Sequence, residues 1–365
     1  DLADPIKIPD QSFRDVLLAG TPDEEGNLMI IDSNGDGHIS YAEAEAVTYL
    51  DVSEQGLTDL TGLEEFINLE KLLCQDNELM LLDVSANEAL TRLVCENNRL
   101  SRLDVSVNAE LRELHCASNQ LFELNLSGNT LIRYLDIGNN KLTAVDLSPI
   151  DSLNEFYCSN NLLFDLDLSQ NGALRVLIAS HNPLAALDLS DNPQLAFLAC
   201  TNSALPTLDL SNNALLEDLY LDSCRITVLD LSGNPALYTL SVVKNQLTGL
   251  DLSSNRQLEN LYCTDNQIST LNISANRELI DLYCAHNQIT QLDLELKFLL
   301  RHLYCGNNQI ASLNLSDNSN LWILDVTQMP SLVEVCVWEL PFPPEHVWVE
   351  NFGSPNIYYT DTCSP

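Results

Sequence analysis

Apolar positions return every 21 residues along most of this chain. Stepping by 21 from Cys74 to Val326 meets only cysteine or another apolar residue, without one insertion. Stepping from Leu82 to Leu313 meets leucine or valine each time. Chance does not keep separate apolar tracks in register over such a length. The pattern therefore predicts a solenoid in which each 21-residue repeat forms one coil of a stack.

Each repeat predicts two short strands. The repeat that begins at Leu90 reads LTRLVCENNRLSRLDVSVNAE. One residue separates Leu93 from Cys95 in its first half, and one residue separates Leu103 from Val105 in its second half. A period of two is typical of a strand with one buried face, and the Asn-rich segments between indicate turns. Stacked coils would pair these strands into two parallel sheets, with ~4.8 Å between coils.

The cysteines of the 21-residue track are predicted to be buried, reduced and inert. Cys95 shares the parity of Leu93, so both point into the core, where a thiol behaves as a small apolar group. Neighbouring ladder cysteines have parallel Cβ directions, which fit disulfide geometry poorly. A row of metal-binding thiols is the alternative, but nothing inside would neutralise thiolates. Cys224 falls on an asparagine track and is also expected to be buried.

Asparagine recurs on two further tracks, one starting at Asn77 and one at Asn87. A buried turn leaves backbone groups without partners, and a side-chain amide offers both donors and an acceptor. We expect stacked asparagines to satisfy these groups from coil to coil.

The repeat resembles the leucine-rich repeat family over residues 50–332. Its halves, LxxLxCxxNxL and LxxLDLxxN, are similar to the bacterial 21-residue alternating class, also called IRREKO repeats. Ordinary members are horseshoes, because helices on the convex side are wider than strands on the concave side. Both sides look strand-like here, so the expectation is a mostly β, weakly curved rod, ~60 Å long. We expect an N-terminal cap over residues 1–47, the solenoid over 48–334 and a C-terminal cap over 335–365.

One outward row of the predicted sheets is acidic. The residue after the Leu82 track is Asp at nine positions, starting at Asp83, and Asn at three. Its parity is opposite to that of the buried track, so it points to solvent. Asp at this position belongs to the consensus sequence of the repeat in the family. The alternative is a strip that attracts cations or a basic partner.

The outward row before the cysteine track is varied, and variety on a regular scaffold is where specificity can lie. Its tyrosines form an exposed stripe in consecutive coils, flanked by an acid and a histidine. Such rows bind protein hot spots or stack on sugars, although tyrosine also simply stabilises sheets. The candidate ligand-binding residues are Tyr220, Tyr262, Tyr283, Tyr304, His302 and Asp281.

The segment DSNGDGHISYAE, residues 32–43, resembles the calcium loop of an EF-hand and matches D-x-[DN]-x-[DN]-G-x5-E without a mismatch. The resemblance implies one Ca²⁺, which would fold the N-terminal cap; the alternative is an acidic turn. The incoming helix, expected over residues 10–19, is displaced from the loop, and no second loop follows. The implied ligands are Asp32, Asn34, Asp36, the carbonyl of His38, Ser40 and Glu43, with Gly37 at the sharp turn.

The Pro-rich and aromatic tail contains Cys336 and Cys363, which lie off the repeat tracks. Similar tails close leucine-rich repeat proteins that bacteria export. In an exported protein these two cysteines would form a disulfide. The chain opens without Met, which suggests that it is a processed or trimmed form.

Charge and motifs exclude several functions. The chain has 53 Asp and Glu against 16 Lys and Arg, a net charge of −37, which disfavours nucleic acid and anionic membranes. No unbroken apolar stretch is long enough to span a bilayer. Six scattered histidines and the lack of HExxH, GxSxG, Walker and GxGxxG motifs argue against an enzyme.

These observations favour a secreted or cell-surface module without catalytic activity, acting as a monomer. We expect it to recognise a protein, or to serve adhesion, through an outward sheet face. The alternatives are glycan binding by the tyrosine stripe and a purely structural spacer.

Overall fold

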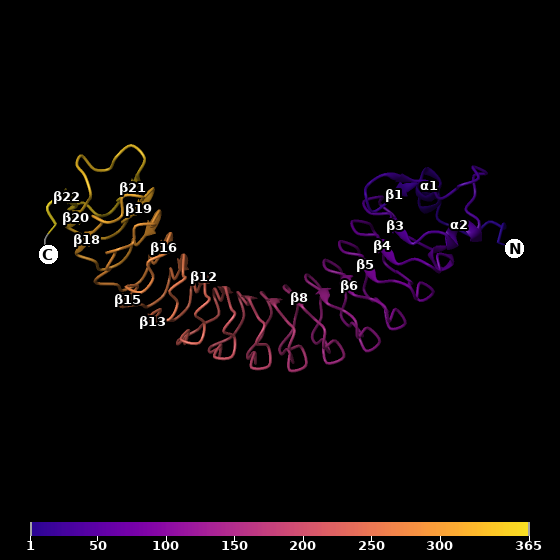
Figure 1. The fold of residues 1–365 in the computed structure, drawn as a ribbon, viewed down its shortest axis with the longest axis horizontal. Helices are drawn as coiled ribbons and strands as arrows, with labels where there is room; N and C mark the ends of the chain where they lie inside the picture. Colours follow the sequence, from indigo (N-terminus) through magenta and orange to yellow (C-terminus); the bar gives the residue numbers. More distant parts are fainter. Residues whose placement is uncertain (1, 364–365) are drawn as a thin grey trace. The chain divides into compact units, whose positions relative to one another are not determined.

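The computed structural model describes residues 2–363, which fold mostly into short strands with few helices (Figure 1). The chain divides after Asn182 into two compact units. Each unit is described by itself below.

The first unit begins with a small helical cap. Helix α1 is capped by Asp10, whose carboxylate accepts the backbone N–H of Phe13 at 2.8 Å, and it buries Phe13 and Leu17. The helix expected over residues 10–19 is therefore confirmed. A two-residue antiparallel hairpin, β1 with β2, separates it from the next helix. The cap elements are α1 (Gln11–Ala19), β1 (Thr21–Pro22), β2 (Leu28–Met29) and α2 (Tyr41–Glu45).

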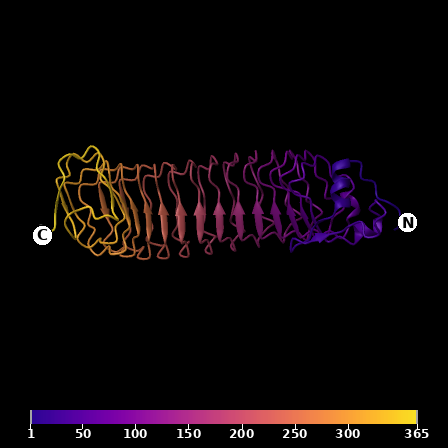
Figure 2. The same ribbon diagram turned by 90° about the horizontal axis from the view of Figure 1, so that it is seen from above.

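The rest of the first unit is a parallel sheet of three-residue strands, one per coil. Figure 2 shows them as arrows side by side that point the same way. Partners are in register at one repeat, as between Leu93 and Leu114. The strands are β3 (Tyr49–Asp51), β4 (Lys71–Leu73), β5 (Arg92–Val94), β6 (Glu113–His115), β7 (Tyr134–Asp136), β8 (Glu155–Tyr157) and β9 (Val176–Ile178), with a 3₁₀ turn at Leu63–Glu65.

The second unit has the same design. Its main strands are parallel and keep the 21-residue register up to the last strand, as between Leu261 and Leu282. The last strand pairs at a separation of 25 residues, Leu324 with Val349. The middle residue of every strand but the last is buried, and most flanking residues are partly exposed on the outward face. The strands are β10 (Phe197–Ala199), β11 (Asp218–Tyr220), β12 (Thr239–Ser241), β14 (Asn260–Tyr262), β16 (Asp281–Tyr283), β17 (His302–Tyr304), β19 (Ile323–Asp325) and β21 (Trp348–Glu350).

The second predicted sheet is present as short segments. In the first unit only single bridges join Asp83, Asp104 and Asn125. A side-chain oxygen of each row residue accepts the N–H two residues later, as Asp209 does from Ser211 at 2.9 Å. This Asx turn bends the chain just after the row residue, so the extended segments are short. The second unit contains β13 (Gly249–Asp251) beside β15 (Thr270–Asn272), and β18 (Ser312–Asn314), β20 (Glu334–Cys336) and β22 (Tyr358–Thr360) together.

Both asparagine ladders join consecutive coils. In the first, the Nδ2 of Asn98 donates to the carbonyl of Cys74 at 2.9 Å, and its Oδ1 accepts the N–H of Leu79 at 3.0 Å. In the second, Asn108 donates to the carbonyls of Val84 and Asn87 at 3.0 and 2.8 Å. The expected coil-to-coil bonding is confirmed.

Asparagine is replaced at several places on these ladders, including Ser203 and Ile150, and two of the replacing residues, Cys224 and Lys297, keep a hydrogen-bond donor. Cys224 stands on the first, where its thiol donates to the carbonyl of Cys200 at 3.0 Å. Lys297 stands on the second, only 1% exposed, with its ammonium 3.2 Å from the carbonyl of Glu295. A donor is therefore retained at both places.

A third polar position needs a left-handed backbone. The residue two places after the cysteine track has a positive φ in each coil, 52° at Asn97 and 56° at Asn160, for example. Asparagine, aspartate and histidine tolerate this region better than most residues. The Asn-rich turns of the sequence follow from this requirement.

Candidate functional site

Three tyrosines stack on the outward face of the second unit. Tyr262, Tyr283 and Tyr304 end β14, β16 and β17, and they are direct partners across the parallel pairs. The ring centroids of Tyr262 and Tyr283 lie 4.9 Å apart, and those of Tyr283 and Tyr304 lie 4.3 Å apart with nearly parallel planes. All three side chains are half-buried. The in-register sheet thus turns a sequence repeat into one aromatic surface.

Asp281 and His302 lie beside this stack and contact each other. The Nδ1 of His302 is 2.6 Å from one oxygen of Asp281, and the hydroxyl of Tyr262 donates to the other oxygen at 3.2 Å. Burial and the charge of Asp281 raise the pKa of Tyr262. Burial and the neighbouring Tyr304 raise the pKa of Tyr283 to about 12. Both phenols are therefore neutral hydrogen-bonding groups near neutral pH.

Tyr220 stands apart from the other candidate residues. Along the sheet its partner is Ser241, which in turn pairs with Tyr262. Its ring packs instead on Phe197, with centroids 5.5 Å apart. We call the remaining five residues the tyrosine cluster: Tyr262, Tyr283, Tyr304, Asp281 and His302.

The aromatic surface extends further than the sequence pattern indicated. The guanidinium of Arg301 lies 4.9 Å from the ring centre of Trp322, and the imidazole of His302 meets the edge of the same ring. Trp322 immediately precedes β19. It lies outside the row of residues before the cysteine track, from which the candidate tyrosines were predicted.

The first unit has an aromatic cluster of its own. His115 stacks on Tyr134 with centroids 4.3 Å apart, and Tyr134 packs on Tyr157 at 5.2 Å. His115 and Tyr157 end their strands, whereas Tyr134 begins β7. Considering both outward positions of each strand would have found it.

A groove of about 740 Å³ lies next to this cluster. The groove lies where two consecutive coils have the small side chains Ser152 and Ala173. The preceding coil has the larger Leu131 at the same position of the repeat. No motif marked this groove, because it depends on side-chain volumes in successive coils. Its lining is Arg112, Glu113, His115, Arg133, Tyr134, Ser152, Asn154, Glu155 and Ala173.

The acidic row points outward, as its parity predicts. Asp188 and Asp230 are exposed, and hydrogen bonds from Ser190 and Ser232 lower the pKa of these carboxyls. Each carboxylate is thus engaged in its own turn, which supports a role in the repeat itself.

The track cysteines are confirmed as buried and outside any disulfide. Burial raises the pKa of Cys74 and of Cys263 to about 12, and that of Cys224 to about 11. Thiolates are accordingly rare at neutral pH. The free cysteines are Cys74, Cys95, Cys116, Cys158, Cys200, Cys224, Cys263, Cys284 and Cys305.

The N-terminal loop folds around its own carboxylates. Asp32 accepts the N–H groups of Gly35 and Gly37 at 2.8 and 2.9 Å. Asn34 accepts from Asp36, and Asp36 accepts from His38. Gly37 has φ of +82°, a conformation that favours glycine. These bonds from backbone N–H groups to side-chain oxygens at positions one, three and five hold the loop in a tight turn.

Glu43 closes the loop from α2. One of its oxygens accepts from the N–H and hydroxyl of Ser33, and the other from the N–H and hydroxyl of Ser40, at 2.8–2.9 Å. Burial raises the pKa of Glu43, but the hydrogen bonds from Ser40 and Ser33 outweigh it and lower the pKa to about 2. The oxygen set suits a hard cation, yet among residues 2–363 no three His, Cys, Asp or Glu side chains stand ready as a metal group.

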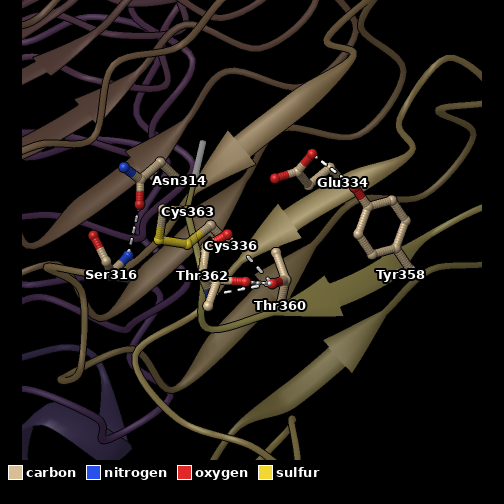
Figure 3. The surroundings of a disulfide bond; sticks show 8 residues. All are labelled: Asn314, Ser316, Glu334, Cys336, Tyr358, Thr360, Thr362 and Cys363. Atoms are coloured by element: carbon tan, nitrogen blue, oxygen red, sulfur yellow. Dashed lines mark hydrogen bonds between the residues drawn. A yellow bond between two sulfur atoms is a disulfide. The ribbon is translucent and has the colours of Figure 1, made fainter. Parts of the chain in front are cut away.

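The predicted disulfide is present between Cys336 and Cys363 (Figure 3). It joins the end of β20 to the segment just after β22, within one small parallel sheet. Tyr358 of β22 also donates to Glu334 of β20 at 2.7 Å. The boundary expected at residues 334 and 335 falls inside β20.

Solved structures identify the family. No family model and no curated protein matches the sequence. The functional domain of InlJ from Listeria monocytogenes, which includes a cysteine ladder, is 32% identical, with a TM-score of 0.70; the match covers 82% of this chain and 70% of that one. The chain is a leucine-rich repeat protein.

Two other bacterial structures share the fold of this leucine-rich repeat protein. The LRR protein LIC12759 from Leptospira interrogans is 21% identical, with a TM-score of 0.69 and coverage of 81% of this chain and 91% of its own. An internalin, inlF, from Listeria monocytogenes is 19% identical, with a TM-score of 0.69 and coverage of 98% and 96%. No helix within residues 2–363 is long and apolar enough to cross a membrane.

Proposed function

We propose that this leucine-rich repeat protein is a non-catalytic binding module, secreted or displayed at the cell surface, that recognises a protein through the tyrosine cluster. The supporting observation is an aromatic surface built from three consecutive coils, with the contacting side chains of Asp281 and His302 beside it. Tyrosines in such a setting are typical of protein hot spots. A structural spacer would not need this local chemistry.

The packing of the rings favours a protein over a glycan. A sugar binds an aromatic side chain by lying on its open face. Tyr283 has Tyr262 against one side and Tyr304 against the other. Its ring edge and hydroxyl remain for contact, and these suit the mixed apolar and polar groups of a protein surface.

The charge of the chain favours a partner with a basic surface. A net charge of −37 creates a long-range field that attracts cations and repels polyanions. Such a field raises association rates and falls with ionic strength. The disulfide supports an oxidising compartment, in agreement with export.

A binding assay on protein arrays and glycan arrays tests the proposal. Tyr283→Ala combined with Tyr304→Ala is expected to weaken protein binding about tenfold or more. Tyr238→Ala removes an exposed tyrosine of the same unit outside the cluster and serves as the matched control. Unchanged protein binding in the double variant would rule out the cluster. Glycan binding that is lost in the same variant would favour the alternative.

We also propose that one Ca²⁺ binds to the loop of residues 32–43 and stabilises the N-terminal cap. Asp32, Asn34, Asp36 and Glu43 would hold it by their side-chain oxygens, with the carbonyl of His38, and Ser40 would take part through water. The ion would supply positive charge to balance the three carboxylates of the loop. The loop bonds described above support this proposal, because they hold the loop in a tight turn that starts at Asp32.

Calorimetric titration with Ca²⁺ and melting with and without EDTA test the metal. We expect saturable binding, and a lower melting temperature in EDTA. Asp36→Asn should weaken binding, whereas Asp23→Asn, in the hairpin turn outside the loop, should not. No heat of binding together with an unchanged melting temperature would refute the site.

A further inference from the structure

The groove of the first unit carries chemistry that the tyrosine cluster does not. Two of its lining residues, Arg112 and Arg133, are neighbours in consecutive coils, since the N–H of Arg133 donates to the carbonyl of Arg112 at 2.9 Å. Both side chains are exposed. The groove volume of about 740 Å³ lies within the range of ligand sites.

Neither guanidinium has an acidic partner. Three other arginines of the first unit, Arg92, Arg99 and Arg102, do lie near a glutamate. Within residues 2–363, no carboxylate lies within ion-pair distance of Arg112 or Arg133. Their five-donor forks are therefore available for a ligand.

The two glutamates of the groove are already engaged. Glu113 lies 3.2 Å from Arg92 and 3.7 Å from the Nε2 of His115. Glu155 accepts the hydroxyl of Tyr157 at 2.9 Å. Among the described residues, neither glutamate lies within ion-pair distance of Arg112 or Arg133. The charges of both glutamates oppose a doubly charged group such as phosphate, so a single carboxylate fits best.

The remaining lining indicates where that carboxylate comes from. Ser152 and Asn154 offer hydrogen bonds, and Glu155 can accept further N–H donors. A peptide segment has both backbone donors and acceptors to match this mixture. A sugar ring would need an open aromatic face, but Tyr134 is covered by His115 and Tyr157.

We propose that this groove binds an Asp or Glu side chain of a polypeptide partner, held by the paired guanidinium groups of Arg112 and Arg133. The aromatic edge of Tyr134 contacts the adjoining peptide. The site uses residues of the first unit only, so it goes beyond the proposed role of the tyrosine cluster. It gives an acidic protein a place to recognise an acidic group.

Selection of a displayed random peptide library on the intact protein tests the site. Peptides that also bind the Arg112→Gln/Arg133→Gln variant are discarded. We expect the remaining peptides to share an Asp or Glu. Replacing that residue by Asn or Gln, or using the double variant, should weaken binding about tenfold to a hundredfold in calorimetry. Recovery of no arginine-dependent peptide, or of peptides without an acid, would overturn the proposal.

Matched variants separate this site from charge, folding and the proposed function. Arg256 and Arg277 are also exposed and one repeat apart but line no part of this groove, so Arg256→Gln/Arg277→Gln should leave peptide binding unchanged. Arg112→Lys/Arg133→Lys keeps charge but loses the planar fork, and should weaken binding less than glutamine does. Tyr283→Ala/Tyr304→Ala should have no effect. Equal loss in both arginine pairs, or tighter binding of sulfated oligosaccharides, would contradict the assignment.

Discussion

The buried asparagine is the side chain on which each junction between coils depends. Asn213 is fully buried and donates to the carbonyls of Leu189 and Asn192 at 3.1 and 3.0 Å. Its own Oδ1 has no hydrogen-bond partner among the described residues. The two donated bonds therefore carry its contribution, since they satisfy carbonyls that water cannot reach.

Asn213→Ala is expected to lower the free energy of unfolding by about 2–4 kcal/mol, because two buried hydrogen bonds that join consecutive coils are lost. The neighbouring Asn212 is exposed, and Asn212→Ala should change it by less than about 0.5 kcal/mol. Denaturant unfolding of both variants measures the difference. Equal stability of the two variants would show that the ladder is not needed.

Glu43 gives the N-terminal cap a defined pH dependence. Its pKa is lowered from 4.5 to about 2, so its carboxylate stabilises the fold above about pH 4.5 and loses this effect as pH falls through about 2. Glu43→Gln should lower the melting temperature at pH 7, and the deficit should shrink toward pH 2. Melting curves in EDTA, with the exposed Glu25→Gln as control, measure it. A deficit that grows on acidification would contradict this account.

At the scale of elements, the disulfide holds the last strands together. β22 pairs only with β20 in its sheet, and Cys336 and Cys363 are 27 residues apart. Cys336→Ser/Cys363→Ser should lower the free energy of unfolding of this region by about 3–4 kcal/mol and expose β22 to proteases. Reduction should reproduce the effect in the natural protein and change nothing in the double variant. Equal protease resistance with and without the disulfide would argue against this role.

Much of the fold could be predicted from the sequence, because a solenoid repeats one local solution. The 21-residue tracks fixed which side chains are buried, and the position of Cys95 beside Leu93 predicted a thiol in the core. The helix that Asp10 caps and the disulfide between Cys336 and Cys363 were also predictable. The intermittent second sheet was not, because every Asp or Asn of the row accepts an N–H of its own turn whether or not its coil forms a strand there.

The candidate site could be predicted only in part. Tyr262, Tyr283 and Tyr304 were evident because one row of the repeat contains them all. Tyr134 and Trp322 lie at other positions of the coil, and the arginine groove depends on the volumes of Ser152 and Ala173. Contacts that cross from one row to another are set by side-chain size and direction, which a single periodic track does not encode.

At the scale of the whole molecule, charge repulsion opposes folding. Folding brings the like charges that make up the net charge of −37 closer together. Dissolved ions screen their repulsion, with a Debye length of ~30 Å at 0.01 M salt and ~8 Å at 0.15 M. The melting temperature should therefore rise by several degrees between these salt concentrations. Melting in NaCl and in KCl, both with EDTA, measures it. A flat or falling curve would show that local carboxylate contacts outweigh the overall field.

The nine buried thiols also allow local unfolding of the protein to be followed directly. They are distributed through both units, and each is protected from alkylating reagents while its coil stays folded. When a coil opens, a thiol becomes available and adds a fixed mass on labelling. Mass spectrometry of partly labelled molecules would thus report which coils open together, without any engineered probe.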